Sequence, residues 1–299
     1  GKEVTAGVQN IILGGLAGDA LTTGSDNVAL GYAALSQEDT GGRSVAIGRS
    51  ALTSQNNDAS NYNVAVGYNS GVSVTTGVQN TLIGGSAGDA LTTGDNNTAM
   101  GYLALSSETL GDRSVAIGNF ALQNQNNTSD TDVYNVAIGY DAGNDITTGV
   151  YNTIMGGLAG DALTTGSRNI AIGFGALTSE DAHGRNVAIG YAALETQNAG
   201  ADAYNTAIGY NAGNDITTGI LNTLIGGLAG DALTEGDSNV AMGYLALSTE
   251  TLGDRNVAIG LGALAAQNNT SDTDVYNTAI GYNAGAAVTT GIQNRWSSW

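Results

Sequence analysis

Short apolar runs of three residues, each followed by a glycine, recur along the whole chain. The run at 136–138 (VAI) lies between Asn135 and Gly139, and comparable runs stand at 28–30 (VAL) and 64–66 (VAV). Runs of this length that are rich in Val, Ile and Thr and bounded by Asn and Gly are typical of short β-strands. A pattern that recurs this often indicates architecture rather than one catalytic site.

The glycine that ends each run gives the repeat length. Successive glycines are 17 residues apart, except before every fourth run, where the separation is 19 or 21. The sequence therefore predicts an all-β fold, a parallel β-solenoid of sixteen coils in four sets, with strands about 4.8 Å apart. Extra residues enter at one place in each set, which indicates a loop on one side of the solenoid. The glycines are Gly14, Gly31, Gly48, Gly67, Gly84, Gly101, Gly118, Gly139, Gly156, Gly173, Gly190, Gly209, Gly226, Gly243, Gly260 and Gly281.

Several columns of the repeat are nearly invariant. Relative to the fixed glycine, such as Gly139, the residue four before is Asn in fourteen coils, as at Asn135, and the residue three after is Ala in fifteen, as at Ala142. We expect the asparagine side chains to form a hydrogen-bonded ladder from coil to coil. The glycines are expected to turn the chain, and those of the first coil in each set are Gly14, Gly84, Gly156 and Gly226.

The two residues before the fixed glycine are apolar in every coil. The nearer one, Ile138 in this example, is always Leu, Ile, Val or Met, and the one before it is Ala in twelve coils and Ile or Leu in four. Successive residues of a strand face opposite sides. We expect Ile138 to fill the coil and Ala137 to face outward, where a neighbouring chain would cover it. A further aliphatic column, with Leu21 and Val74, predicts a second short strand in each coil.

Composition and charge narrow the function classes. The chain has 46 glycines, no proline, no cysteine and a formal net charge of −19. Disulfides and thiolate metal sites are therefore excluded, and the absence of proline suits strands that are nearly all internal to a sheet. The negative charge argues against nucleic acid and anionic membranes as partners. No apolar run is long enough for membrane insertion, and residues 1–10 contain no hydrophobic segment typical of a signal peptide.

The word N-[VT]-A-[ILMV]-G, followed two residues later by Ala, resembles the head repeats of YadA-like trimeric autotransporter adhesins. It is also similar to the repeat arrays of bacteriophage tail fibres. The resemblance covers residues 5–294. It implies a left-handed β-roll in which three identical chains pack side by side as a homotrimeric fibre. No receptor-binding motif of the family has a counterpart in this sequence.

The domain organisation follows from the repeat. Residues 1–294 are expected to form one continuous solenoid domain whose sets close near residues 71, 143, 213 and 285. The chain begins in mid-coil, which favours a segment of a longer fibre. Residues 295–299 (RWSSW) depart from the repeat and are interpreted as a cap, a junction or a chain end, since solenoids need blocked ends.

Few residues are candidates for chemistry. The inserted loops at 126–134 and 268–276 place carboxylates two residues apart, which suits calcium, although they lack the glycine and distal glutamate of a calcium loop. These weak candidates are Asp130, Asp132, Asp272 and Asp274. A solvated loop without a metal or other cofactor is the favoured interpretation. The recurring GGLAGDALTTG segment lacks the G-K-[ST] of a phosphate loop and is interpreted as a turn.

Other candidates recur once in each set or stand alone. The arginines Arg43, Arg113, Arg185 and Arg255 are each expected to pair with a nearby carboxylate. The tyrosines Tyr62, Tyr134, Tyr204 and Tyr276 are expected to pack under the inserted loop, with sugar stacking as the alternative. His183 is the single histidine and has no partner repeat, so it is poor support for catalysis.

The sequence therefore predicts a non-enzymatic structural fibre segment of a surface adhesin or viral tail fibre. It would act as a rigid spacer or head in attachment to a host surface, and its expected location is extracellular, on a cell or virion. A host-surface receptor or glycan is a possible partner. The alternative is a solenoid that binds glycans or ice. Ice binding is disfavoured because the Thr-Thr pair occurs in only two coils of four.

Overall fold

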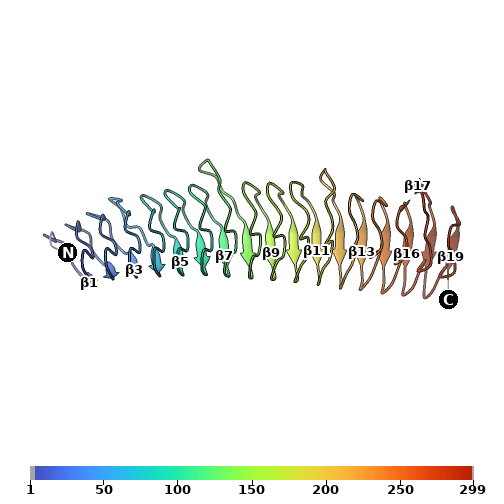
Figure 1. Ribbon diagram of the computed structural model, residues 1–299, viewed down its shortest axis with the longest axis horizontal. Coiled ribbons are helices and arrows are strands. Elements are labelled where there is room, and N and C mark those ends of the chain that lie inside the picture. Colours follow the sequence, from blue (N-terminus) through green and yellow to red (C-terminus); the bar gives the residue numbers. More distant parts are fainter. Residues whose placement is uncertain (1–3, 298–299) are drawn as a thin grey trace. The chain divides into compact units, whose positions relative to one another are not determined.

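The computed structural model describes residues 4–297, which fall into two compact units, Gly1–Tyr151 and Asn152–Trp299. Each unit is a parallel β-solenoid, and the described residues contain no helix (Figure 1). The prediction of an all-β parallel solenoid is confirmed. The first three residues of the expected repeat domain, and Ser298 and Trp299 of the expected end segment, lie outside the described residues.

The first unit contains one three-residue strand per coil, and consecutive strands pair in parallel without any shift in register. In the pairing of β6 with β7, for example, Ala99 lies opposite Ala116. Each step of 17 or more residues therefore returns the chain to the same position in the coil. The strands are β1 (Ile11–Leu13), β2 (Val28–Leu30), β3 (Val45–Ile47), β4 (Val64–Val66), β5 (Thr81–Ile83), β6 (Thr98–Met100), β7 (Val115–Ile117) and β8 (Val136–Ile138).

The second unit repeats this arrangement. Its coil strands are β9 (Thr153–Met155), β10 (Ile170–Ile172), β11 (Val187–Ile189), β12 (Thr206–Ile208), β13 (Thr223–Ile225), β14 (Val240–Met242), β16 (Val257–Ile259), β18 (Thr278–Ile280) and β19 (Arg295–Ser297). A two-stranded sheet pairs β15 (Gly253–Asp254) with β17 (Thr273–Asp274), which lies within the last inserted loop. Although 295–297 departs from the repeat in sequence, β19 pairs with β18 in the register of an ordinary coil.

The second strand expected in every coil is largely absent. Apart from β15, β17 and two isolated bridges, the rest of each described coil consists of turns, bends and irregular segments. Its backbone still bonds to the next coil, but without a ladder: the amides of Thr5, Ala6 and Gly7 all donate to the carbonyl of Thr22. One carbonyl that serves several donors cannot form the evenly spaced pairs of a parallel sheet.

The fixed glycines are required by the approach of neighbouring coils. Gly84 has a φ of +141°, and a Cβ there would lie 2.3 Å from the carbonyl oxygen of Gly101 in the next coil. A Cβ at Gly101 would likewise lie 2.3 Å from the carbonyl oxygen of Gly118. A side chain at this column would push adjacent coils apart, so the column turns the chain, as expected, and also permits the coil spacing.

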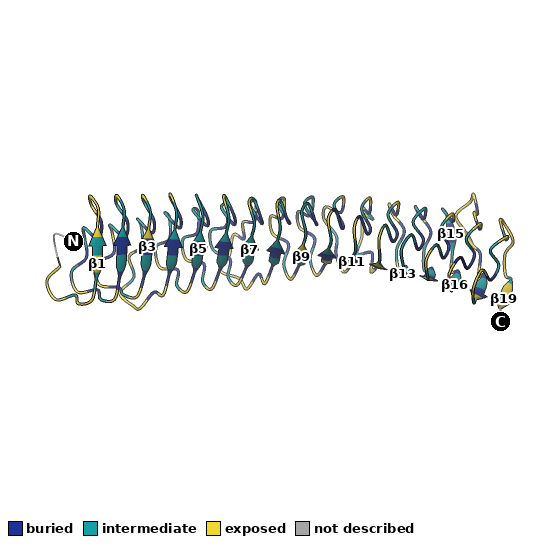
Figure 2. Cartoon of the chain, turned by 90° about the horizontal axis from the view of Figure 1, so that it is seen from below, coloured by how far each residue is buried: buried dark blue, intermediate teal, exposed yellow. Residues whose placement is uncertain are grey.

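The strand residues point in the opposite directions from those expected. Ala137, the middle residue of β8, is fully buried inside the coil, whereas Ile138 faces outward and is partly exposed. The prediction that Ile138 fills the coil is therefore wrong. The middle residue is buried in the same way in every coil strand from β2 to β18, and Figure 2 shows the exposed residues gathered along the outer edges of the coils. The interior is too narrow for two rows of large side chains, so alanine occupies the strand.

The set of four coils arises from volume matching inside the solenoid. Four positions after the fixed glycine, the second and third coils carry a buried leucine such as Leu52, and the first and fourth carry glycine. Leu82, the large strand residue of a first coil, fills the space left by these glycines: a Cβ at Gly71 would lie 2.6 Å from Leu82 Cδ1, and one at Gly88 2.8 Å from Leu82 Cδ2. Close packing of this kind tolerates no added methyl group without movement.

The asparagine column forms a ladder, but most of its bonds run from side chain to backbone. The Oδ1 of Asn80 accepts the amide of Asn97 in the next coil at 2.9 Å, and Nδ2 of Asn80 donates to the carbonyl of Gly94 at 2.8 Å. Asn135 likewise donates to the carbonyl of Gly149 and to Oε1 of Gln125. Each buried amide thus satisfies backbone groups that the absent second strand leaves unpaired. Ala142, which belongs to the nearly invariant alanine column three residues after the fixed glycine, is fully buried.

Replacement of Gly226 by alanine should destabilise the protein by about 2–4 kcal/mol, because the new Cβ meets the backbone of Gly243 at 2.7 Å and φ is +134°. Gly227→Ala is the matched control, since its Cβ makes an ordinary contact of 3.5 Å with the ring of Tyr244. Chemical denaturation measures both. Equal stability of the two variants would contradict the role of the fixed column.

Replacement of Asn80 by alanine should cost about 2–4 kcal/mol, because it leaves the buried amide of Asn97 and the carbonyl of Gly94 without their partners. The control is Asn56→Ala at an exposed side chain. Urea denaturation of both variants gives the difference. If Asn80→Ala loses no more unfolding free energy than Asn56→Ala, the asparagine ladder does not stabilise the fold.

Candidate functional site

Four arginines, one in each set, lie on the surface beside the inserted loops. Arg113, Arg185 and Arg255 form ion pairs with Asp132, Asp202 and Asp274, respectively. The expectation that each arginine pairs with a nearby carboxylate is confirmed. Arg43 differs only in its partner: its Nε lies 3.8 Å from Asp26, in the preceding coil, and its Nη1 also donates to the hydroxyl groups of Ser60 and Tyr62.

The tyrosines beside these arginines are exposed rather than packed under the loops. About half of the Tyr62 side chain is exposed (51%), and the guanidinium of Arg43 lies over its ring, 5.5 Å from the centroid. Tyr134, Tyr204 and Tyr276 have equivalent arginine neighbours. The expected packing under the loop is therefore wrong: each ring is held at the surface by a cation–π contact.

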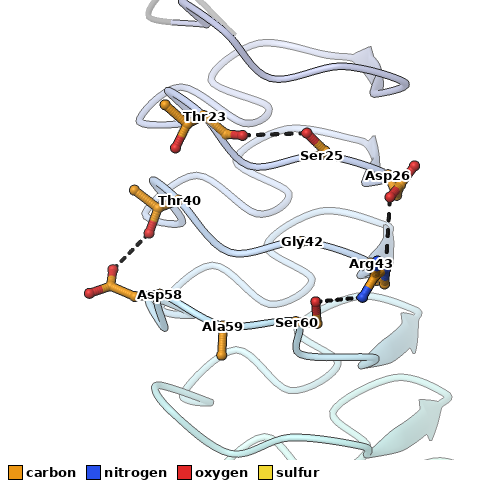
Figure 3. Close-up of a pocket in the computed structure, with 9 residues that line it drawn as sticks. All are labelled: Thr23, Ser25, Asp26, Thr40, Gly42, Arg43, Asp58, Ala59 and Ser60. Carbon is orange, nitrogen blue, oxygen red and sulfur yellow. Dashed lines mark hydrogen bonds and ion pairs between the residues drawn. The ribbon is translucent and has the colours of Figure 1, made fainter.

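A polar pocket of about 400 Å³ lies in the first set, where Ser60 stands at the position of the aspartates that pair with the other three arginines. Its lining comes from three successive coils (Figure 3). Oγ1 of Thr40 donates to Asp58 at 2.7 Å, and Nη1 of Arg43 donates to Oγ of Ser60 at 2.8 Å. The lining residues are Thr23, Ser25, Asp26, Thr40, Gly42, Arg43, Asp58, Ala59 and Ser60.

The loop carboxylates proposed for calcium divide into two kinds. Asp132 and Asp274 are paired with arginine, so a cation would compete with Arg113 and Arg255 for them. Asp130 and Asp272 lie at exposed positions of the loops. The prediction of a loop without a metal, and its weaker alternative of calcium binding, both stay untested.

A column of buried glutamates, one in each set, was not anticipated from the sequence. Glu108 is fully buried: Oε1 accepts the amide of Gly111 at 2.9 Å, and Oε2 accepts Nε2 of Gln125 at 2.9 Å and Nδ2 of Asn127 at 3.0 Å. These donors offset the cost of burying the carboxylate. The available signal was the column seven residues after the fixed glycine, which is aliphatic in the first and fourth coils of each set but Glu in the second and Gln in the third. The matching residues are Glu38, Glu180 and Glu250.

The third set departs from this pattern. Ala199 stands where the second set has Asn127, and the single histidine, His183, places Nδ1 3.6 Å from Oε1 of Glu180. With Asp181, these residues place one possible ligand atom each within 4.8 Å of one another. Both Glu180 oxygens already accept hydrogen bonds, from the amide of His183 and from Gln197, so a metal ion would have to displace these donors.

An aromatic column follows the fixed glycines on the outer surface. Tyr140, directly after Gly139, is 56% exposed. Phe174, Tyr191 and Tyr210 stack in consecutive coils, with centroids 5.7 and 5.5 Å apart. Tyr102, Phe120 and Tyr140 meet edge to face instead, so the column makes aromatic contacts between coils in both geometries.

Asp112 lies where acidic side chains of consecutive coils come together. Burial raises the pKa of Asp112 above its ordinary value of 3.8, and the charges of Asp95 and Asp130 raise it further, although the amide of Asp95 donates to it at 2.6 Å. Burial raises the pKa of Asp254, its counterpart in the last set, in the same way, with the charges of Asp272 and Asp237 adding to the effect. A raised pKa in the folded state means that ionisation opposes folding.

The comparisons with known proteins add no family. No protein-family model and no curated protein sequence matches the chain. Among residues 4–297, the structure has no helix with the length and apolar character that a membrane span requires.

Asp112→Asn should raise the thermal midpoint at pH 7, because the amide keeps an oxygen for the Asp95 N–H and carries no charge. With the folded pKa raised, the cost of the aspartate is absent below about pH 3.8 and grows as pH rises through the folded pKa. The advantage of the variant should therefore vanish in acid. Calorimetry at pH 7 and below about pH 3.8 tests this, with the exposed Asp145→Asn as the control variant. A gain in thermal midpoint in acid equal to the gain at pH 7 would contradict the prediction.

Proposed function

We propose that this chain is a non-enzymatic structural segment of an extracellular attachment fibre, either a surface adhesin or a viral tail fibre. One observation carries the proposal: the features that every coil repeats are those that build the solenoid. The fixed glycines, the asparagine bonds and the buried small residues all serve contacts between coils. Repetition of one unit by nearest-neighbour contacts is the physical basis of an extended scaffold.

We propose further that the segment assembles as a homotrimer. The support is the third residue of the coil strands, which faces outward and is Leu, Ile, Val or Met in every coil strand from β1 to β18. Ile117 and Ile225 are partly exposed there, and Ile47, Met155 and Ile208 more so. Parallel sheets are normally covered on both faces, and the coil interior covers only one. A second and third copy would remove this aliphatic column from water.

Contacts with a receptor are assigned in this proposal to the inserted loops. In the first unit, the loop between β7 and β8 extends beyond the neighbouring coils (Figure 1). Loops that project from one side of a solenoid often carry binding, while the coils hold them in place. Deletion of this segment from the surface structure that carries it should abolish attachment. Unchanged attachment would contradict the adhesion role.

The assembly is tested by sedimentation equilibrium. The wild-type chain should sediment at three times the chain mass of 29.9 kDa. Ile117→Asp, which places a charge on the outward face of β7, should shift the mass to that of a single chain. Thr128→Asp adds the same charge to an exposed loop and should leave the trimer intact. A wild-type protein with the mass of one chain would overturn the trimer.

A further inference from the structure

The pocket of the first set exists because two acidic residues of other sets are replaced by small ones. Ser60 occupies the position of Asp132, Asp202 and Asp274, and Gly42 occupies that of Asp112 and Asp254. In the second set, Asp112 and Asp132 approach each other in a parallel bridge. The corresponding bridge of the first set, Gly42 with Ser60, has the same backbone but far less side-chain volume, and the pocket opens there.

Arg43 keeps its position beside the loop although Ser60 replaces the loop aspartate of the other sets. Its Nη1 donates to Oγ of Ser60 at 2.8 Å and to the hydroxyl of Tyr62 at 2.9 Å, and Asp26 balances part of its charge. Half of the side chain is exposed (50%). Within the described residues no hydrogen bond of Nη2 is found, so donors of Arg43 remain available to a ligand in the pocket.

The remaining lining supplies matching acceptors and hydroxyl groups. Asp58 uses Oδ1 to accept from Thr40, while Asp26 contacts Arg43 at 3.8 Å, outside hydrogen-bond distance. Ser25 and Thr40 both donate and accept. Figure 3 shows these groups in three adjacent coils, with Thr40 and Asp58 on one side of the pocket and Asp26, Arg43 and Ser60 on the other, so each side holds a carboxylate.

This lining selects the chemistry of the ligand. Two carboxylates and one guanidinium leave a formal charge of −1, and the chain carries −19, so an anion is disfavoured. The guanidinium in turn disfavours a cation. The lining offers little apolar surface beyond Ala59, which disfavours an apolar ligand. A polyhydroxyl ligand fits, because each hydroxyl can donate to a carboxylate while it accepts from arginine.

We propose that this pocket binds one pyranose residue of a neutral saccharide, with Arg43 donating to its hydroxyl oxygens and Asp26 and Asp58 accepting its hydroxyl protons. The volume of about 400 Å³ falls at the smaller end of ligand sites, which span roughly 300–1,000 Å³. The inference goes beyond the fibre role and does not depend on it, since the pocket is built from one chain.

The test is a titration of the full chain with the methyl glycosides of glucose, galactose, mannose and N-acetylglucosamine, followed by amide NMR. At least one glycoside should shift the amide signals of Gly42, Arg43 and Ser60 in a saturable way. Ser60→Asp recreates the ion pair of the other sets and should weaken binding at least tenfold. Ser129→Asp, which adds the same charge to an exposed loop of the second set, should bind like the wild type.

Three results would overturn the proposal. The first is the absence of saturable shifts at these amides with every glycoside. The second is undiminished binding by Ser60→Asp, whose fold is verified by an otherwise unchanged spectrum. The third is tighter binding of glucuronate, or of calcium alone, than of any neutral glycoside, which would show that the site selects charge.

Discussion

The close approach of successive coils at the fixed glycines is the constraint on which the rest of the structure depends. At Gly84 a Cβ would lie 2.3 Å from the carbonyl oxygen of the next glycine, so the spacing between coils admits only hydrogen at this column. That spacing keeps neighbouring strands in register, as where Ala99 of β6 lies opposite Ala116 of β7. It also brings the Asn80 side chain within hydrogen-bond distance of the Asn97 amide.

A narrow coil has consequences on both of its faces. Inside, alanines such as Ala137 leave room for one large residue at a time, and Leu82 fits only because Gly71 and Gly88 stand beside it. Glu108 can be buried because turn amides and amide side chains converge on it. Outside, the larger aliphatic residues are displaced to the surface, and this apolar column is the support for assembly with further copies of the chain.

Sequence periodicity was sufficient to predict the parallel solenoid, because the 17-residue spacing of the fixed glycines is set by the length of one coil. It could not give the facing of β8: alternation shows that Ala137 and Ile138 face opposite sides, but not which side is inside. The deciding quantity is the width of the interior, a tertiary property. The pocket beside Arg43 was missed for a related reason, since it arises from volume absent at Gly42 and Ser60, which lie in different coils.

Amide hydrogen exchange tests most directly whether contacts between coils at the glycine and asparagine columns hold the fold. The amide of Gly101 donates to the carbonyl of Ile83 at 2.8 Å, and that of Asn97 donates to a side chain outside any strand. Both should exchange as slowly as the strand amides of β6, while the amide of Ser129 in the exposed loop exchanges fast. Exchange of Asn97 and Gly101 at the rate of Ser129 would contradict the account.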